Sequence, residues 1–227
     1  MARLKKSVLG KVSGAVGDLL FRLRNGKNFI GMRPSSFMPG TDPDSIARRN
    51  RFRIDVKFSR TVNSIVPLKM LWGKYTPNTM LPFNYIFKTN YYNVIAEDMT
   101  DAAQLVPDVG FDVPGPTITM SSSQIQVQTL AIGTGTGIDP LIETDFQLVA
   151  VVYMKDKTDE NYQDYLFLQF VFVKQVLSLA DPLTFTIDLS DAQSILYDRY
   201  NVHKGYFALL SLDALEEPIH FSNTFIS

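Results

Sequence analysis

The sequence has 227 residues, of which 45% are hydrophobic and 12% aromatic, so it can form a full-sized core and is not a disordered chain. It contains no cysteine, which excludes disulfides and thiolate metal ligands, and its apolar runs are shorter than the roughly 20 residues of a membrane-spanning helix. The net charge of −1 hides an uneven distribution: residues 1–75 hold 16 Lys and Arg against 4 Asp and Glu, whereas residues 76–227 hold 6 against 19. This asymmetry fits nucleic acid at the basic end, copies that dock basic end to acidic body, or solvated surface charge without a partner.

The N-terminal segment MARLKKSVLGKVSGAVGDLLFRLR does not match a signal peptide, because Lys11 and Asp18 interrupt its apolar part. We therefore expect the protein to act in the cytoplasm, or in a particle assembled there. Gly10, Gly14 and Gly17 disfavour a helix by about 1 kcal/mol each relative to alanine, which predicts an extended or tightly turned arm. A phosphate-binding glycine loop is not expected, since the Lys-Ser/Thr ending of that motif is missing.

A basic β-hairpin is predicted over residues 19–32, because Asn25-Gly26 separates two alternating segments. Pairing across a two-residue turn places Arg24 opposite Lys27 and Arg22 opposite Phe29. Arg22, Arg24, Lys27 and Phe29 then share one face, and Phe21, Leu23 and Ile30 share the other. With Arg33, the basic face either binds a polyanion or matches the surface of another protein. A two-stranded hairpin is marginal alone, so it must pack on the chain or on a neighbour.

A helix is predicted from Pro43 to Ser64, capped by Asp42 and ending before Pro67. Its apolar stripe comprises Ala47, Ile54, Phe58, Val62 and Ile65. The basic residues on its other side recur at helical spacing and form one edge: Arg49, Arg53, Lys57 and Arg60. This edge is either the solvated side of an amphipathic helix or a stripe that faces a partner.

A second helix is predicted over about 80–96, with Trp72 anchoring the junction between the helices. From residue 116 onward the hydrophobic period changes to two, which predicts an antiparallel β-sandwich of the immunoglobulin or fibronectin kind. Residues 190–200 are expected to form a short helical crossover. The fold class is therefore α+β, divided into a basic arm, hairpin and helical region (1–115) and an acidic sandwich (116–227). Strands are expected over about 116–120, 124–132, 144–154, 164–174, 183–189, 205–213 and 219–226.

No residue constellation indicates a reaction, and we expect a non-enzyme without cofactor, metal or small-molecule substrate. His203 and His220 have no second ligand at metal-binding spacing and are interpreted as ordinary surface or edge-strand residues. The acidic loop 156–164 lacks the glycine and the spacing of an EF-hand, so a solvated loop is preferred over a calcium site. The segment Gly133–Gly137 is interpreted as a flexible hairpin loop.

Four segments in this order, GKVSGAVGDLLFRLRNGKNFIGMRPSS, ARRNRFRIDVKF, MLPFNYIFKTNYYNVI and YFALLSLDALEEPIHFSNTFIS, carry a resemblance across nearly the whole chain. They resemble an uncharacterised family of similarly sized Bacteroidota proteins, a domain of unknown function. The glycine-rich start, the hairpin and an Arg-Pro pair of that family match Gly14, Gly17, Arg33 and Pro34, and its Arg-x-x-Phe element matches Arg49 and Phe52. The ending Ser222-Asn223-Thr224-Phe225 departs mildly from the family pattern. The resemblance implies no activity, and it points to the arm and hairpin as the special part of the chain.

The leading hypothesis is a structural or assembly protein that oligomerises through its arm and basic hairpin. Its setting would be a phage or phage-derived particle, as a connector, ring, tail or decoration component. The arm could add a strand to the sheet of a neighbouring copy. The alternative is a nucleic-acid-binding module that uses the basic third of the chain. A further alternative is a carbohydrate- or surface-binding sandwich that uses Tyr153, Tyr162 and Tyr165, which would require export. Expected partners are copies of the chain or other particle proteins; no membrane is expected.

Overall fold

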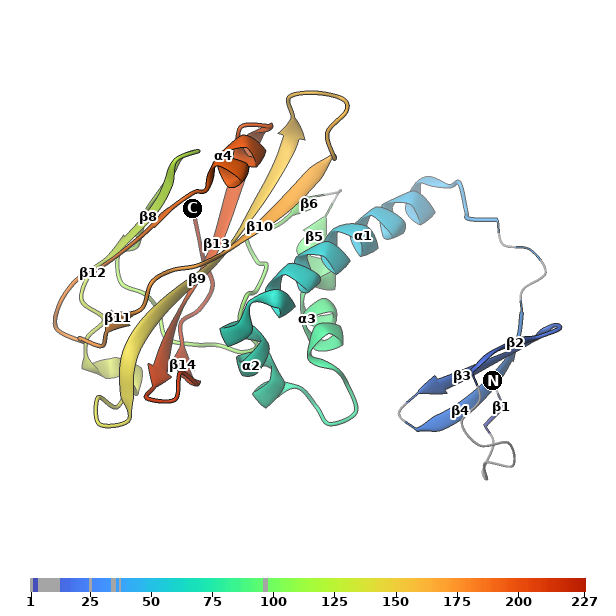
Figure 1. The fold of residues 1–227 in the computed structure, drawn as a ribbon, viewed down its shortest axis with the longest axis horizontal. Coiled ribbons are helices and arrows are strands. Elements are labelled where there is room, and N and C mark those ends of the chain that lie inside the picture. The colour runs from blue at the N-terminus through green and yellow to red at the C-terminus, as the bar shows by residue number, and fades with distance from the viewer. Residues whose placement is uncertain (1, 4–12, 25, 34–35, 37, 96–97) are drawn as a thin grey trace. The chain divides into compact units, whose positions relative to one another are not determined.

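The computed structural model describes residues 2–3, 13–24, 26–33, 36, 38–95 and 98–227. Within them, the chain is a mixed α/β protein with four α-helices and several antiparallel sheets, and most strands lie in the C-terminal part (Figure 1). The chain separates into two compact units, Met1–Ile46 (the N-terminal unit) and Ala47–Ser227 (the C-terminal unit).

The N-terminal unit is a four-stranded antiparallel sheet with the order β1-β4-β3-β2. Its register pairs Arg24 with Lys27 and Arg22 with Phe29, so the predicted hairpin is confirmed. Gly26 has φ of +72°, which the tight turn requires, and Asn25 lies outside the described residues. Part of the glycine-rich arm is itself a strand that pairs with β3, whereas Gly10 and Lys11 fall outside the described residues. The strands are β1 (Ala2–Arg3), β2 (Gly14–Val16), β3 (Leu19–Arg24) and β4 (Lys27–Met32).

The first helix has the predicted bounds. Helix α1 spans Pro43–Ser64, and the backbone N–H of Ser45 donates to Asp42 Oδ1 at 2.8 Å, as expected of a capping aspartate. A helix α2, Val66–Tyr75, follows directly and was not predicted. Pro67 starts this helix, because a proline in the first turn removes only an N–H that would have no helical partner. Trp72 therefore belongs to α2, and it is buried at the helix junction, as predicted.

The second predicted helix is shorter than expected. Helix α3 covers Pro82–Asn90 and continues as a single 3₁₀ turn, Tyr91–Asn93, instead of reaching residue 96. The buried Asn90 side chain donates to the carbonyl of Gln104 at 3.0 Å and accepts from its N–H at 2.7 Å. Asn93 likewise donates to the carbonyl of Ala102 at 2.9 Å. These asparagines bind the next loop, which ends the helix and places residues 94–95 in a short strand.

The main sheet of the C-terminal unit has the strand order β10-β9-β13-β14, with β11 paired to β9 and β15 to β13. A three-stranded sheet, β12-β8-β7, and a short pair, β5-β6, complete the unit. The strands are β5 (Val94–Ile95), β6 (Asp98–Met99), β7 (Thr117–Met120), β8 (Gln124–Thr129), β9 (Glu143–Lys157), β10 (Tyr165–Val171), β11 (Gln175–Val176), β12 (Leu183–Asp188), β13 (Tyr200–Asp213), β14 (Pro218–Phe221) and β15 (Phe225–Ile226).

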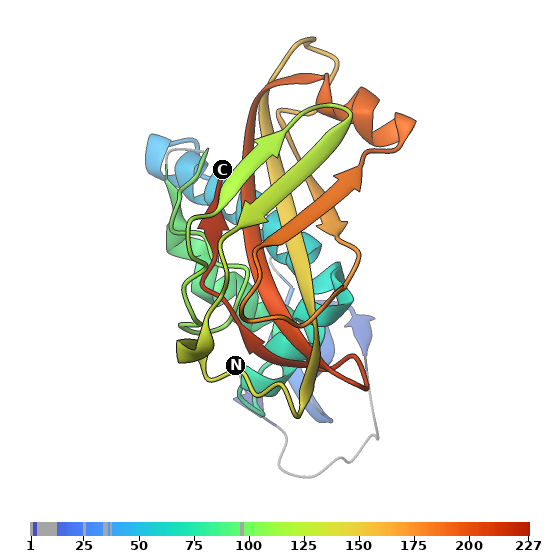
Figure 2. The ribbon, with the colours of Figure 1, turned by 90° about the vertical axis from the view of Figure 1, so that its left-hand side faces the viewer.

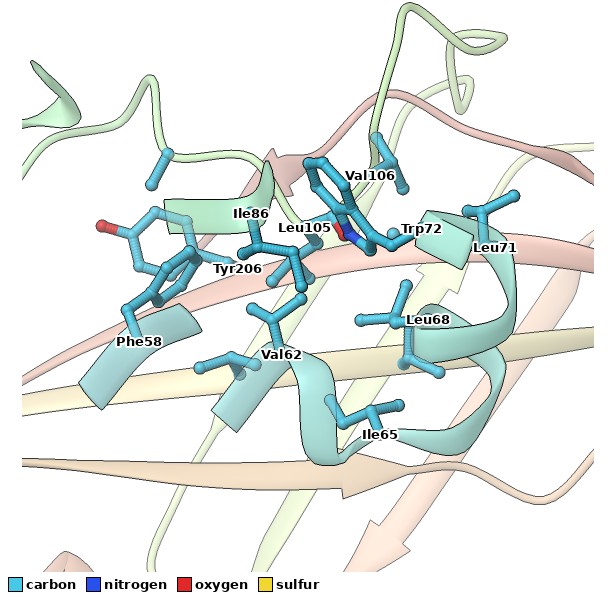
Figure 3. Packing of buried hydrophobic residues seen from close by; sticks show 14 of the residues in the cluster. Phe58, Val62, Ile65, Leu68, Leu71, Trp72, Ile86, Leu105, Val106 and Tyr206 are labelled. Atoms are coloured by element: carbon cyan, nitrogen blue, oxygen red, sulfur yellow. The ribbon is translucent and has the colours of Figure 1, made fainter. Parts of the chain in front are cut away.

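The long strands β9 and β13 are buried on both faces and separate two cores. Helices cover one face of the main sheet and the three-stranded sheet covers the other, as Figures 1 and 2 show. On the helical side, Phe58 and Val62 of α1 and Trp72 of α2 pack with Tyr206 of β13 (Figure 3). The indole N–H of Trp72 donates to the carbonyl of Leu105 at 2.8 Å. The other core joins β9 and β13 to residues such as Val127 and Phe185 of the smaller sheet.

All of the predicted strand regions contain strands, and helix α4 (Asp191–Tyr197) forms the predicted crossover. The hairpin interpretation of Gly133–Gly137 is wrong: β8 pairs with β12 and β7, whereas β9 pairs with β10 and β13, so this segment passes from one sheet to another. Helices α1 to α3 share a core with β9 and β13, and the boundary between the two compact units falls between Ile46 and Ala47. The division into a basic arm, hairpin and helical region (1–115) and an acidic sandwich domain (116–227) stays a prediction.

Candidate interaction surfaces and polar sites

One face of the N-terminal sheet is apolar. Cross-strand partners in an antiparallel sheet lie on the same face, and the register pairs Leu19 with both Val16 and Met32, and Phe21 with Ile30. Leu23, two residues beyond Phe21, belongs to this face as well. We call these six residues the apolar sheet face: Val16, Leu19, Phe21, Leu23, Ile30 and Met32.

The apolar sheet face is open to solvent. Val16 and Met32 are 69% and 79% exposed, and Leu19 and Leu23 are 44% and 38% exposed. No side chain that the structure describes between residues 13 and 46 is buried. The N-terminal unit therefore has no core of its own within the described residues.

The opposite face carries the predicted basic residues. Arg22 and Lys27 are exposed, Phe29 is half-buried beside Arg22, and Arg33 follows the sheet at an exposed position. Arg24 pairs with Lys27 through the backbone, and its side chain lies outside the described residues. The hairpin therefore brings Arg22, Lys27 and Phe29 together, as the alternation of the sequence predicts.

The predicted basic edge of α1 is mostly exposed. Arg49, Arg53 and Arg60 are exposed, and Lys57 is half-buried. Arg53 and Lys57 lie against their own chain: the Lys57 ammonium is 4.3 Å and the Arg53 guanidinium 5.9 Å from the ring centroid of Tyr165. Burial lowers the pKa of Lys57, and the neighbouring Arg53 lowers it further, whereas Asp164 acts in the opposite direction. These two cations thus contact an aromatic ring of their own chain, and Lys57 also donates to Gln163 Oε1 at 3.1 Å.

A cavity of about 220 Å³ lies between α1 and the β9–β10 hairpin. Asp156, on its rim, has φ of +61°, an uncommon conformation for a residue other than glycine. Lys155 is ion-paired with Asp98. The cavity is lined by Asn50, Arg53, Ile54, Tyr153, Lys155, Asp156, Asp164 and Tyr165. It therefore brings one residue of the predicted site, Arg53, together with two of the tyrosines that the sequence singles out.

Those tyrosines do not form an exposed platform. Tyr153 and Tyr165 are only 2% and 5% exposed. Burial raises the pKa of both hydroxyls, and Asp98 adds to the effect on Tyr153. Tyr162 is half-buried, and the guanidinium of Arg199 lies 4.7 Å from its ring centroid. A carbohydrate-binding surface made of these three rings is therefore inconsistent with their burial.

Asp55 is a buried acid inside the helical core. Its side chain accepts a hydrogen bond from Ser59 Oγ at 3.2 Å, and its Oδ2 atom has no partner among the described residues. Burial raises the pKa of this carboxyl to about 7, although the Ser59 hydrogen bond acts in the opposite direction. Asp55 is thus a titratable group within α1 that the apolar periodicity of the helix does not reveal.

A second buried acid orients a histidine. Glu143 is 1% exposed, and its carboxylate accepts from the backbone N–H of Asp139 at 2.8 Å and from Ser211 Oγ. His220 Nδ1 lies 3.0 Å from Glu143 Oε1. This contact leaves Nε2 as the ring atom available to a ligand. His220 lines a cavity of about 330 Å³ together with Tyr75, Phe111 and Thr136.

The Glu143–His220 pair was not found from the sequence. His220 does lie on β14, at the edge of the main sheet, as predicted, but its partner is 77 positions away in sequence. Such an arrangement can hold an imidazole in one orientation for proton transfer or for binding. Ser211 is fully buried and hydrogen-bonded to the carboxylate, so it does not act as a nucleophile here. The other histidine, His203, stacks on Tyr197 with 3.7 Å between ring centroids.

Comparisons with known proteins assign no family. No family model matches the chain, and no curated protein matches it. Among solved structures, a β-glucosidase from Kluyveromyces marxianus is 14% identical; the match covers 61% of this chain and 17% of that chain, with a TM-score of 0.24. A likeness at this level carries no argument. None of the helices in the described part of the chain combines the length and hydropathy that crossing a bilayer requires.

Proposed function

We propose that the protein is a non-enzymatic structural protein that assembles with copies of itself through its N-terminal sheet. The observation that carries this proposal is the exposure of the apolar sheet face. Contiguous apolar surface of this kind marks interaction sites, and a small sheet without a covered face is only marginally stable. If another copy of the chain covered this face, the burial of apolar surface would stabilise both the sheet and the contact between the copies.

The charge distribution favours another copy of the chain as the partner. The N-terminal unit contains 8 Lys and Arg against 3 Asp and Glu, whereas the C-terminal unit contains 14 against 20. Arg22 and Lys27 extend from the face opposite the apolar one, and Glu160 of the acidic loop is 96% exposed. Opposite charges on two ends of one chain favour head-to-tail contacts, which produce rings or filaments.

The proposed setting is a phage or phage-derived particle, in which the protein serves as a connector, ring, tail or decoration component. This part of the proposal rests on the sequence, namely the charge asymmetry and the glycine-rich segment before the hairpin. In the same proposal, the main sheet and the three-stranded sheet of the C-terminal unit form an immunoglobulin- or fibronectin-like support for the assembling N-terminal unit. The shared core between these sheets is the support for that fold assignment.

The test replaces residues of the apolar sheet face by glutamate in the full chain. Leu23→Glu and Met32→Glu place a charge on this face at exposed positions, so the sheet itself should persist by circular dichroism. Sedimentation velocity should show the native oligomer converted to a monomer. Leu141→Glu is the matched control, because Leu141 is 95% exposed in a loop of the C-terminal unit. Unchanged assembly in both sheet variants would refute the proposed interface.

Nucleic-acid binding is the second candidate, favoured by the position of Arg22 and Lys27 on the face that also carries Phe29. Phosphates would contact the cations and bases would stack on the aromatic ring. Each neutralised phosphate should add about 0.9 to the log–log salt dependence of duplex binding. Arg22→Gln with Lys27→Gln should then reduce that slope by about 2.

A further inference from the structure

The strongest unassigned feature is the cavity between α1 and the β9–β10 hairpin, because one buried hydroxyl in its lining lacks an ordinary hydrogen bond and one arginine lacks an ion pair. Tyr165 lines this cavity and is 5% exposed, yet its hydroxyl makes no hydrogen bond of ordinary geometry with the described residues. A buried hydroxyl without a partner costs free energy, so such groups in native proteins usually meet a ligand or water.

Arg53 is the second group, and it lines the cavity as an exposed arginine. Its guanidinium donates to Asn50 Oδ1 at 3.2 Å and lies over Tyr165, but it forms no ion pair with any carboxylate that the structure describes. Burial raises the pKa of the Tyr165 hydroxyl, whereas Arg53 acts in the opposite direction through its charge and as a donor outside ordinary hydrogen-bond geometry, so the two groups interact directly. Arginine retains several N–H donors for a planar or tetrahedral oxyanion.

The remaining charges of the cavity are already paired or hydrogen-bonded. Lys155 pairs with Asp98, and Asp164, which is 66% exposed, lies 3.3 Å from the ammonium of Lys157. Asp156 accepts a hydrogen bond from Asn201 at 3.1 Å. The donors that remain on the lining include the Arg53 guanidinium and the Tyr165 hydroxyl, beside the side chains of Asn50 and Tyr153. Lys57 lies beside them, over the Tyr165 ring, at 4.3 Å from its centroid.

We propose that this cavity binds a small oxyanion, of carboxylate or phosphate type, through Arg53 and the hydroxyl of Tyr165. Both groups are donors, so the ligand must supply acceptor oxygens, and the guanidinium favours a negative charge on it. A volume of about 220 Å³ accommodates one such group. Lys57 contributes long-range attraction from the rim. The anion is either free in solution or attached to a larger molecule, and the binding chemistry is the same.

The proposal is tested by equilibrium dialysis of the full chain against radiolabelled inorganic phosphate, with sodium chloride used to hold the ionic strength constant. One phosphate per chain should bind saturably. Arg53→Gln should weaken binding about tenfold, equivalent to about 1.4 kcal/mol. Tyr165→Phe keeps the ring and removes only the hydroxyl, and it should weaken binding about threefold, as expected for one lost hydrogen bond.

Lys69→Gln is the matched control, because it removes one exposed positive charge of the same unit away from the cavity. It should bind phosphate like the native chain. Competition by acetate, or by peptides ending in a free carboxylate, distinguishes a free anion from a carboxylate on a larger molecule. Absence of saturable binding to both phosphate and acetate, or equal affinity in Arg53→Gln and Lys69→Gln, would overturn the proposal.

This inference is independent of the proposed assembly, and the two fail separately. Arg53→Gln should retain the sedimentation coefficient of the native chain while its phosphate binding weakens. Met32→Glu should show the opposite pattern, since its position lies in the N-terminal sheet. A variant that changes both properties would contradict the independence of the two sites.

Discussion

At the scale of single residues, Asp55 is the most informative side chain, because it is a buried acid in the middle of an amphipathic helix. A charged Asp55 is disfavoured by its surroundings, and its pKa is raised to about 7. In the unfolded chain the same carboxyl titrates near pH 4, at about 3.9. The folded state therefore binds the proton more tightly than the unfolded state. The contribution of protonated Asp55 to the free energy of unfolding is fully present below about pH 4 and is lost as the pH rises through about 7.

Asp55→Asn should remove this pH dependence. The variant should gain stability relative to the native chain as the pH increases, up to about 3–4 kcal/mol at pH 8, because one pKa unit corresponds to about 1.4 kcal/mol. The measurement is urea unfolding of both proteins at pH 5, 6, 7 and 8, at equal protein concentration. Asp198→Asn, at an exposed position, controls for the change in charge. A constant difference across these pH values would contradict the assignment.

Long-range pairs are the residues that the sequence could not reveal. Glu143 and His220 meet because β9 and β14 both lie beside β13, and nothing in their local sequence encodes that contact. In contrast, the faces of Arg22 and Phe29 followed from alternation and a two-residue turn, since that register depends only on neighbouring positions. The helical spacing of Arg53 and Lys57 was likewise predictable from the sequence. Their contact with the ring of Tyr165 was not, because Tyr165 is distant in sequence.

At the scale of elements, capping and periodicity predicted α1 and α4, whereas α2 and the end of α3 were missed. A proline such as Pro67 can either end one helix or lie in the first turn of the next. Only the packing of Leu68, Leu71 and Trp72 decides between these two roles. The end of α3 depends on the asparagine contacts to residues 102–104, which are tertiary interactions.

A close approach of two segments gives a prediction for Gly110. Phe111 forms a parallel bridge to Ser222, and a Cβ atom on Gly110 would lie 2.1 Å from the carbonyl oxygen of Phe221. Gly110→Ala should therefore lower the free energy of unfolding by about 2 kcal/mol or more, since the clash is with backbone. Gly135→Ala is the control, because nothing lies within 4 Å of its Cβ position. Equal stabilities in urea unfolding would contradict this account of residues 110–111.

At the scale of the whole molecule, the mixed helix-then-strand order was predictable, because the hydrophobic period changes after residue 116. The layering was not, since β9 and β13 are buried on both faces and alternate residues of these strands enter different cores. An alternating pattern cannot distinguish a strand with one solvated face from a strand between two apolar layers when the second layer is distant in sequence. The immunoglobulin-like assignment stays a prediction.

The charge distribution belongs to this scale as well. Lys157 pairs with Glu160 and Asp164 inside the acidic loop, and Arg53 and Lys57 lie beside that loop. Of the predicted basic site residues, those with exposed side chains are Arg22, Lys27, Arg33, Arg49, Arg53 and Arg60. The basic contribution to an assembly contact should come mainly from the N-terminal sheet and the exposed part of the α1 edge.

The central claim is that the chain associates with itself, and its mass in solution tests this most directly. Light scattering behind size exclusion on the full chain, at about 50 mM and about 500 mM salt, with absorbance at 260 and 280 nm, gives mass and nucleic-acid content together. We expect a nucleic-acid-free mass that is an integral multiple of 25.6 kDa at low salt and decreases at high salt. A mass of 25.6 kDa under both conditions would contradict self-assembly.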